Sequence, residues 1–491
     1  MFRLSGSELL LTAAFAVCLV AQLFVPPCIG MANNGDFAKS IGRFALGPDD
    51  RFPPQNYDYF STRWVYDRQN LWISDNRSSE LIPIAAALYI GWQFSNQEFD
   101  IRILGAVHAL LWLGCFAALL PLLRPLPGWT RYAAAAAALL VFSDVSYVAY
   151  CNSFYTDTAA FLALSWAAVL WLHLMQGQRP RAGLFAWFVL ASILAVSSKP
   201  QHSLLGLLLL APAAMAAWRF EGARRKAGAI ALGLLIPLTG WVTFLQTPQA
   251  EKESAEFGVI FTKILPRSAA PQEDVRELGL GPEDLRYTGQ WADQSAGDPL
   301  TNPDWRAEFG RRASHGKMAR FYVRHPWRAA MMVYRDLHEN GRWRRPRNIG
   351  NYEREAGYPP ETRTGSFGWW SALRSALFRV APWHILLWYA AFLGMGIRVA
   401  WRNRGTEVWR IAVFGIVLAA MGLTELALTA LADAGETERH LFLFHVITDF
   451  TMLLALVWGL PRVTLAYGPA LEILAHRGAI PARARFSTRA S

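Results

Sequence analysis

Long uncharged apolar blocks recur along this 491-residue chain and constrain its fold more than any other feature. A helix that spans a bilayer needs roughly 20 consecutive, mostly apolar residues. Charged residues make up only 17% of the chain, against about 25% in typical soluble domains. We therefore expect an all-α polytopic membrane protein with about ten transmembrane helices. The blocks lie at 9–25, 101–123, 132–148, 158–175, 184–196, 203–218, 227–246, 383–400, 411–431 and 441–460. The block 184–196 is notably short.

Basic residues fall in every second short loop, which predicts the orientation of the chain, because cytoplasmic loops are enriched in Lys and Arg. With the N-terminus inside, the predicted inner loops hold Arg124 and Arg131, then Arg179 and Arg181, and later Arg402 and Arg404. Both termini are then cytoplasmic. The net charge of +11 is explained by this topology, and no nucleic-acid-binding motif accompanies it, so we expect no nucleic-acid partner.

Two segments are too polar for lipid, and both fall on the outer side in this topology. The first, 26–100, is rich in carboxylates and ends in a semi-apolar stretch at 81–94, which is shorter than a span and suits a juxtamembrane helix. The second is 247–381. We divide the chain into an N-terminal transmembrane module (1–246), a periplasmic insertion (247–381), C-terminal transmembrane helices (382–462) and a cytoplasmic tail (463–491).

The insertion is predicted to be mostly helical and soluble, with helices near 272–280, 303–324 and 326–340. It is rich in Trp and Arg. Aromatic and cationic side chains together suit the binding of carbohydrate and phosphate. They equally suit a domain that rests on lipid headgroups, where both residue types are common. The composition does not separate these two interpretations.

The strongest local signal is the run NNGDF at 33–37, just beyond the first apolar block. Asn and Gly favour a tight turn, which would fix Asp36 beside Asn34 at the membrane surface. A carboxylate held there is suited to act as a general base. An Asx turn or a helix N-cap would explain the same residues.

Two basic residues break the topology pattern because they lie in short outer loops. They are Lys199, in SSKPQH at 197–202, and Arg439, in GETERH at 435–440. A cation placed against the positive-inside rule often has an anionic partner, and a lipid-linked phosphate in the outer leaflet would be one. A local salt bridge, for instance between Arg439 and Glu436 or Glu438, is the alternative.

Other polar residues sit at or inside the predicted spans. Asp157 opens the fourth span, where the helix dipole favours a carboxylate, so it is either a cap or a site residue. Glu425 and Asp449 are costly in hydrocarbon and are expected to pair with Arg439 or His445 or to line a polar cavity. Ligand spacing gives no support for a divalent metal, and common nucleotide-binding, zinc and serine-hydrolase motifs are absent.

Together these features resemble the GT-C class of membrane glycosyltransferases, which use polyprenyl-phosphate sugars. Asp36 matches the acidic residue of that class's first outer loop, SFYTD at 153–157 resembles its later helix-opening motif, and Arg439-His440 resembles its phosphate-contacting position. More narrowly, NNGDF at 33–37, FYVRHP at 321–326 and GETERHLF at 435–442 resemble bacterial glycan-biosynthesis hexose transferases of the WsfD type. Phe37 stands where the best-known GT-C pattern has a second acid.

The resemblance implies a GT-C-like bundle in the inner (cell) membrane of a bacterium, where one sugar, a hexose, moves from a polyprenyl phosphate to a glycan or lipid-linked acceptor with inversion. Asp36 would be the base. Arg439, His440 and Lys199 would bind the donor phosphate, and the residues expected to bind substrate or support the site are Asn34, Tyr155, Asp157, Glu425 and Asp449. A lipid-linked glycan flippase, an O-antigen ligase or polymerase, and a non-catalytic scaffold are the competing interpretations.

Overall fold

A computed structural model of the chain describes residues 3–48, 57–71, 77–126, 128–176, 179–295 and 299–459. The predicted cytoplasmic tail (463–491) lies outside these residues. Eight helical stretches among the described residues are long and apolar enough to cross a membrane. A ninth candidate is α5 (Gly128–Phe142) together with Val145–Asn152, which begins with α6 (Val145–Val148) and is bent by 54° from α5. Five of the eight are single helices, namely α1 (Gly6–Leu23), α7 (Asp157–Met175), α10 (Ala223–Leu245), α17 (His384–Arg402) and α18 (Glu407–Ala432). The other three are longer than one element: Arg102–Leu123 contains α4 (Arg102–Leu119), Pro200–Trp218 contains α9 (Leu205–Trp218), and Thr437–Gly459 begins with α19 (Thr437–His440).

The sequence prediction of ten spans is therefore too high by one or two. Every predicted block is helical, but α8 (Ala182–Val196) has only 15 residues. A rise of about 1.5 Å per residue makes it some 23 Å long, which is short of the ~30 Å hydrocarbon core. It packs among longer neighbours, against α7 and α10.

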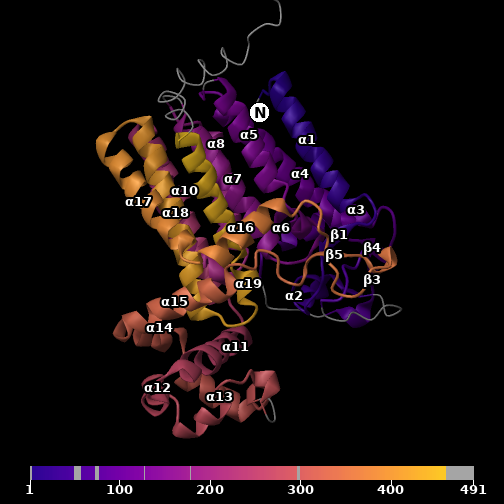
Figure 1. The fold of residues 1–491 in the computed structure, drawn as a ribbon, viewed down its shortest axis with the longest axis vertical. Helices are drawn as coiled ribbons and strands as arrows, with labels where there is room; N and C mark the ends of the chain where they lie inside the picture. The colour runs from indigo at the N-terminus through magenta and orange to yellow at the C-terminus, as the bar shows by residue number, and fades with distance from the viewer. Residues whose placement is uncertain are drawn as a thin grey trace, which may run out of the picture.

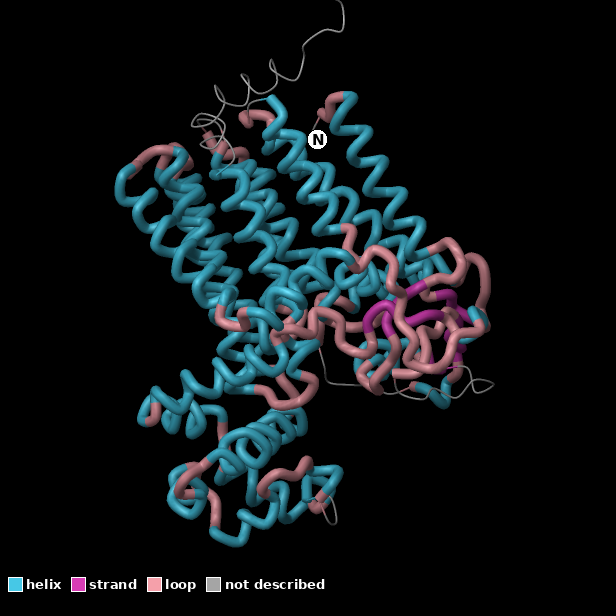
Figure 2. Tube along the Cα trace, viewed as in Figure 1, coloured by secondary structure: helices cyan, strands magenta, loops and turns pink. Residues whose placement is uncertain are grey.

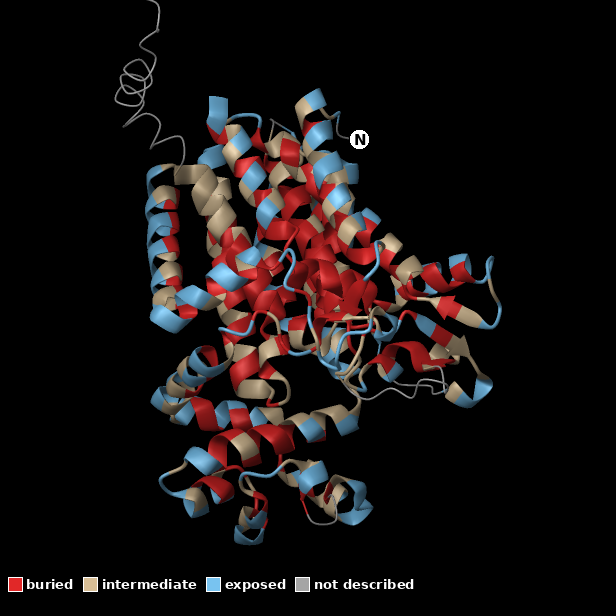
Figure 3. Cartoon of the chain, turned by 45° about the vertical axis from the view of Figure 1, so that its right-hand side comes forward, coloured by how far each residue is buried: buried red, intermediate tan, exposed pale blue. Residues whose placement is uncertain are grey.

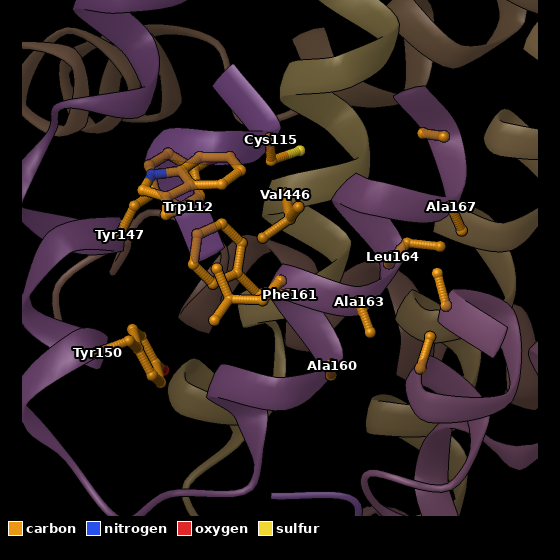
Figure 4. Packing of buried hydrophobic residues seen from close by; sticks show 14 of the residues in the cluster. Trp112, Cys115, Tyr147, Tyr150, Ala160, Phe161, Ala163, Leu164, Ala167 and Val446 are labelled. Atoms are coloured by element: carbon orange, nitrogen blue, oxygen red, sulfur yellow. The ribbon is translucent and has the colours of Figure 1, made fainter. Parts of the chain in front are cut away.

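The core of the bundle is apolar and aromatic, and the outer faces of the helices are apolar as well. Buried residues fill the middle of the bundle (Figure 3), where Trp112, Phe161 and Val446 from three different helices meet (Figure 4). Large apolar side chains on the outer faces of α1, α10 and α17 are exposed, among them Leu10, Leu238 and Ile397. Apolar surface on both faces of a helix is what a bilayer-embedded bundle requires.

The two polar segments lie at the same end of the bundle, opposite the start of α1 (Figure 1). The first includes α2 (Phe37–Ile41) and α3 (Leu81–Gly91), the latter packed against α4. The second begins with α11 (Gln249–Gly258) directly after α10. This shared end agrees with the expectation that both segments leave the membrane on one side.

Small antiparallel sheets join parts of these segments, so the fold is mostly helical rather than all-α. The strands β2 (Leu46–Pro48), β3 (Arg63–Tyr66) and β4 (Glu98–Asp100) form one sheet in the order β2-β3-β4. In the other, β1 (Ile29–Met31) pairs with β5 (Ile349–Tyr352), with Gly30 opposite Asn351. The strands gather in one region beside the helices, as the magenta segments in Figure 2 show. Strands of three or four residues are too short to show a period of two in the sequence.

The insertion contains the three predicted helical pieces and several more helices. The three predicted pieces correspond to α12 (Pro271–Glu277), to α13 (Pro303–Arg312) together with α14 (His315–Arg324), and to α15 (Pro326–Asn340). The predicted helix 303–324 is broken at Ser314, whose hydroxyl accepts a hydrogen bond from the Lys317 amide and caps α14. The final part, including β5 and α16 (Trp369–Val380), returns to the bundle (Figure 1).

Candidate functional site

Arg439 is the centre of a charged cluster at the polar end of the bundle. Its guanidinium donates to Asp36 at 2.7 Å, to Asp157 at 3.2 Å and to Glu436 at 2.6 Å. The Cζ atom of Arg439 lies 4.6 Å from the centroid of the Tyr155 ring. The arginine side chain is only 6% exposed, so the three carboxylates compensate a cation that is largely removed from water. We call Arg439, Asp36, Asp157 and Glu436 the Arg439 cluster.

Local backbone structure places each member of this cluster. Asn33 Oδ1 accepts from the Gly35 and Phe37 amides, and Asn34 Oδ1 accepts from the Asp36 amide. The tight turn expected from NNGDF is therefore present, and its Asx hydrogen bonds come from Asn33 and Asn34 rather than from Asp36. Asp36 occupies the N-cap position of α2 without capping it. Its carboxylate turns instead toward Arg439 and Lys39.

Asp157 is the first residue of α7, and its buried carboxylate lies between two cations. Lys199 Nζ is 3.7 Å from one oxygen, and Arg439 binds the other. A carboxylate at a helix N-terminus is favoured by the dipole. Thr156 occupies the N-cap position without a side-chain hydrogen bond, and the Asp157 carboxylate contacts Lys199 and Arg439 instead, so capping alone does not account for its position.

Lys199 has Asp157 as an ionic partner but no hydrogen-bond acceptor among the described residues. Its side chain is 18% exposed. A buried ammonium without a hydrogen-bond acceptor is costly. This position therefore favours an anion.

The remaining predicted phosphate ligand, His440, lies beside Arg439 but already has a carboxylate partner. Its Nδ1 is 2.5 Å from Asp433, and burial opposes ionisation of Asp433 while His440 and the nearby lysines hold its pKa well below the usual range. Tyr155 and Asn34 complete the surroundings, since the tyrosine hydroxyl lies 2.9 Å from Asn34 Oδ1.

The protonation state of Asp36 follows from the same contacts. Burial raises the cost of ionising this carboxyl, but Arg439 and Lys39 outweigh that cost and hold its pKa well below the usual range. Lys39 Nζ binds Oδ1 at 2.7 Å while Arg439 binds Oδ2. Asp36 is thus ionised at neutral pH, and both of its oxygens are engaged.

These groups open onto one cavity of about 1200 Å³. Its polar wall includes Asp36, Lys199 and Arg439, so the three residues that the sequence predicted to converge do line a common space. The cavity continues along α9, α10 and α18, where its lining is mostly apolar and includes Leu207, Pro237, Trp241, Phe244, Leu423, Ala427, Leu428 and Leu431. The insertion closes another side through α11 and α14.

Glu425 and Asp449 do not have the partners that the sequence suggested, and neither lines the cavity. Glu425 binds His202 at 2.9 Å and Gln201 at 3.0 Å, and so supports the Lys199 loop from behind. Asp449 is fully buried and its partners are all distant in sequence, namely Arg344, Arg374, Tyr147 and Trp370. Pairing with Arg439 or His445 was expected because those residues are close in sequence.

Sequence reasoning missed several groups around the cavity. Lys39 stands one helical turn after Asp36, which is a readable (i, i+3) signal. Tyr57, whose hydroxyl donates to Glu436, and Glu251, on α11, carry no such signal. Arg439 lies between Asp36 and Asp157, in the position that a metal shared by those two carboxylates would need.

The fold and composition define a multi-pass integral membrane protein with a charged cavity at one end of its helical bundle. The chain belongs to the YfdI N-terminal transmembrane domain family, whose model matches residues 3–467. That description names a transmembrane domain and no activity. No curated protein and no solved structure matches the chain significantly.

Proposed function

We propose that this protein is a GT-C-like membrane glycosyltransferase that moves one hexose from a polyprenyl-phosphate donor to a glycan or lipid-linked acceptor, with inversion, in a bacterial inner membrane. The observation that carries the proposal is the juxtaposition of Lys199 and Arg439 across Asp157, on a cavity whose wall changes from charged to apolar. A phosphate attached to a long hydrocarbon chain likewise has one charged end and one apolar end.

The charged end suits the phosphate. Lys199 Nζ has no hydrogen-bond acceptor among the described residues, and a phosphate oxygen would supply one. Arg439 offers a planar fork of donors that matches phosphate geometry. These cations would also stabilise the charge that develops on the phosphate as it leaves.

The apolar end suits the hydrocarbon chain. Leu207 is 62% exposed and Trp241 60% exposed, and both line the cavity as well as lying on helices that are apolar enough to cross the membrane. The cavity is therefore continuous with the lipid-facing surface of α9 and α10. A lipid donor can enter from the bilayer without leaving hydrocarbon.

The reaction requires that Asp36 be released from its ion pairs. An acceptor hydroxyl attacks the anomeric carbon, the bond from that carbon to the phosphate oxygen breaks, and the hydroxyl proton passes to Asp36. With Arg439 and Lys39 both bound, this carboxylate is a weak base. A donor phosphate that takes over Arg439 would free Asp36 Oδ2 and raise its basicity at the moment it is needed.

The test is turnover by the purified full-length protein in liposomes, with undecaprenyl phosphate carrying radiolabelled glucose and membrane extract as the source of acceptor. We expect label to move into the acceptor with the wild type and not with Asp36→Asn, while both bind the donor. Wild-type-level transfer by Asp36→Asn would exclude the base assignment. Failure of the wild type with every polyprenyl-phosphate hexose tried would exclude the function.

A further inference from the structure

Glu251 stands out among the acidic residues that line the cavity. Asp36, Asp433 and Glu436 each form at least one ion pair. The Glu251 carboxylate forms neither an ion pair nor a hydrogen bond with any residue that the structure describes, although it faces the cavity from the first turn of α11.

The charged groups that act on Glu251 come from two other parts of the chain, α2 with its N-cap residue and the turn before η5 (Pro200–Leu204). Lys39 on α2, Lys199 before η5 and Asp36 all act on it electrostatically without touching it. Burial raises the pKa of Glu251, and Lys39 offsets part of that increase. A carboxylate this close to the charged end, with its oxygens unused, is available to accept hydrogen bonds from a ligand.

Trp291 adds an aromatic surface on the same side of the cavity. It is half-buried and precedes the short turn η9 (Ala292–Gln294), which packs against α11. Gly258 makes this approach possible, since a Cβ at that position would lie 3.0 Å from the Trp291 ring and 3.1 Å from Ala434. The ring is thereby held in place at the cavity wall, and its indole N–H makes no hydrogen bond within the described residues.

We propose that Glu251 and Trp291 form the acceptor subsite and that the acceptor presents a sugar ring there. The chemistry is that of a carbohydrate: an acceptor-only carboxylate takes hydrogen bonds from hydroxyl groups, and an aromatic face packs on the apolar face of the ring. This subsite belongs to the insertion, which lines the same cavity as the apolar residues of α9 and α10. The inference rests on the proposed function, because it supplies the second substrate of that reaction.

Kinetics of the full-length protein in liposomes test this assignment. Glu251→Gln keeps the shape of the side chain and removes its charge, and we expect the acceptor KM to rise roughly tenfold or more, as for a lost charged hydrogen bond. Trp291→Ala should act in the same direction, with the donor KM unchanged for both. Glu273→Gln, an exposed position on α12, is the matched control and should equal the wild type. Unchanged acceptor KM, or equal loss of donor binding, would overturn the subsite.

Partition of the radiolabelled product between an organic and an aqueous phase shows whether the acceptor sugar belongs to a lipid-linked acceptor or to a glycan. Label in the organic phase identifies a lipid-linked acceptor, and label in the water-soluble polymer identifies a glycan.

Saturation-transfer NMR with methyl glucoside and methyl galactoside needs no turnover, and so separates failure of the subsite from failure of the proposed reaction. We expect transfer from the wild type to at least one glycoside and its loss in Trp291→Ala. Absence of transfer to both, or equal transfer from the variant, would contradict the subsite.

Discussion

Asp36 is the residue on which the proposed chemistry depends, and the cations around it determine how its contribution to stability varies with pH. Its folded pKa is lower than the ordinary Asp value of about 3.9. The stability that its ionised form contributes is therefore complete above about pH 4, and is lost as the pH falls from there toward the folded value. Physiological changes in pH leave this ion pair intact.

Asp36→Asn should lower the midpoint of thermal unfolding, because a carboxylate that accepts from Arg439 and Lys39 is lost. The difference between wild type and variant should be constant from pH 8 to pH 5 and should narrow only below about pH 4. Thermal unfolding of both proteins in detergent, from pH 8 to below pH 4, measures this difference in midpoint. A difference that widens between pH 7 and pH 5 would mean that the folded pKa of Asp36 is raised, and a difference that stays constant below pH 4 would mean that it is ordinary.

At the scale of elements, the pairing of β1 with β5 brings the first polar segment and the end of the insertion together. Gly30 is essential to this contact. A Cβ there would lie 2.8 Å from the Asn152 carbonyl oxygen and 2.4 Å from the Phe60 ring. The backbone neighbour cannot move without shifting η4 (Ala149–Asn152).

Gly30→Ala should therefore destabilise the protein by about 1–3 kcal/mol, the usual cost of overpacking. Gly6→Ala is the matched control, since a Cβ at Gly6 meets nothing within 4 Å. The measurement is the unfolding midpoint of both variants beside the wild type. Equal midpoints for all three proteins would show that β1 is not held as tightly as its contacts require.

Asp449, a buried acid of the last described helix, can either stabilise the fold or bind the substrate, and substitution of this residue distinguishes these two roles. It accepts from Arg344 at 2.7 Å and from Arg374 at 2.5 Å, and all three side chains are almost completely buried. Asp449→Asn leaves two arginines without a counter-charge, which should cost about 3 kcal/mol or more. We expect a lower unfolding midpoint and normal donor binding below it. Selective loss of donor binding at an unchanged midpoint would place Asp449 in the substrate site.

Sequence patterns predicted the elements well where the pattern was long and local. The apolar blocks, the helix at 81–94 and the turns of NNGDF all have a signal within about 20 residues. The short strands had none, because each has only three or four residues, and the partners of β1 and of Asp449 lie more than 70 positions away in the chain. Arg439 was singled out by its violation of the charge rule, but that rule does not say which carboxylates it binds.

At the scale of the whole molecule, the fold brings a charged cavity and a lipid-facing apolar surface into one continuous space. Asp36, Asp157 and Arg439 come from the first outer segment, the start of α7 and the loop before the last helix. The sequence predicted that Asp36, Lys199 and Arg439 converge on one cavity, and all three line it; the contact of Arg439 with Asp157 was not predicted. Their chemical roles stay predictions.

The central claim is that this cavity binds a lipid through its phosphate. The most direct test is equilibrium binding of undecaprenyl phosphate and of undecaprenol, which lacks the phosphate, to the protein in nanodiscs. We predict that the wild type prefers the phosphate by at least about tenfold and that Lys199→Met, which keeps the apolar stem, loses this preference. Equal binding of the two lipids by the wild type would contradict the account.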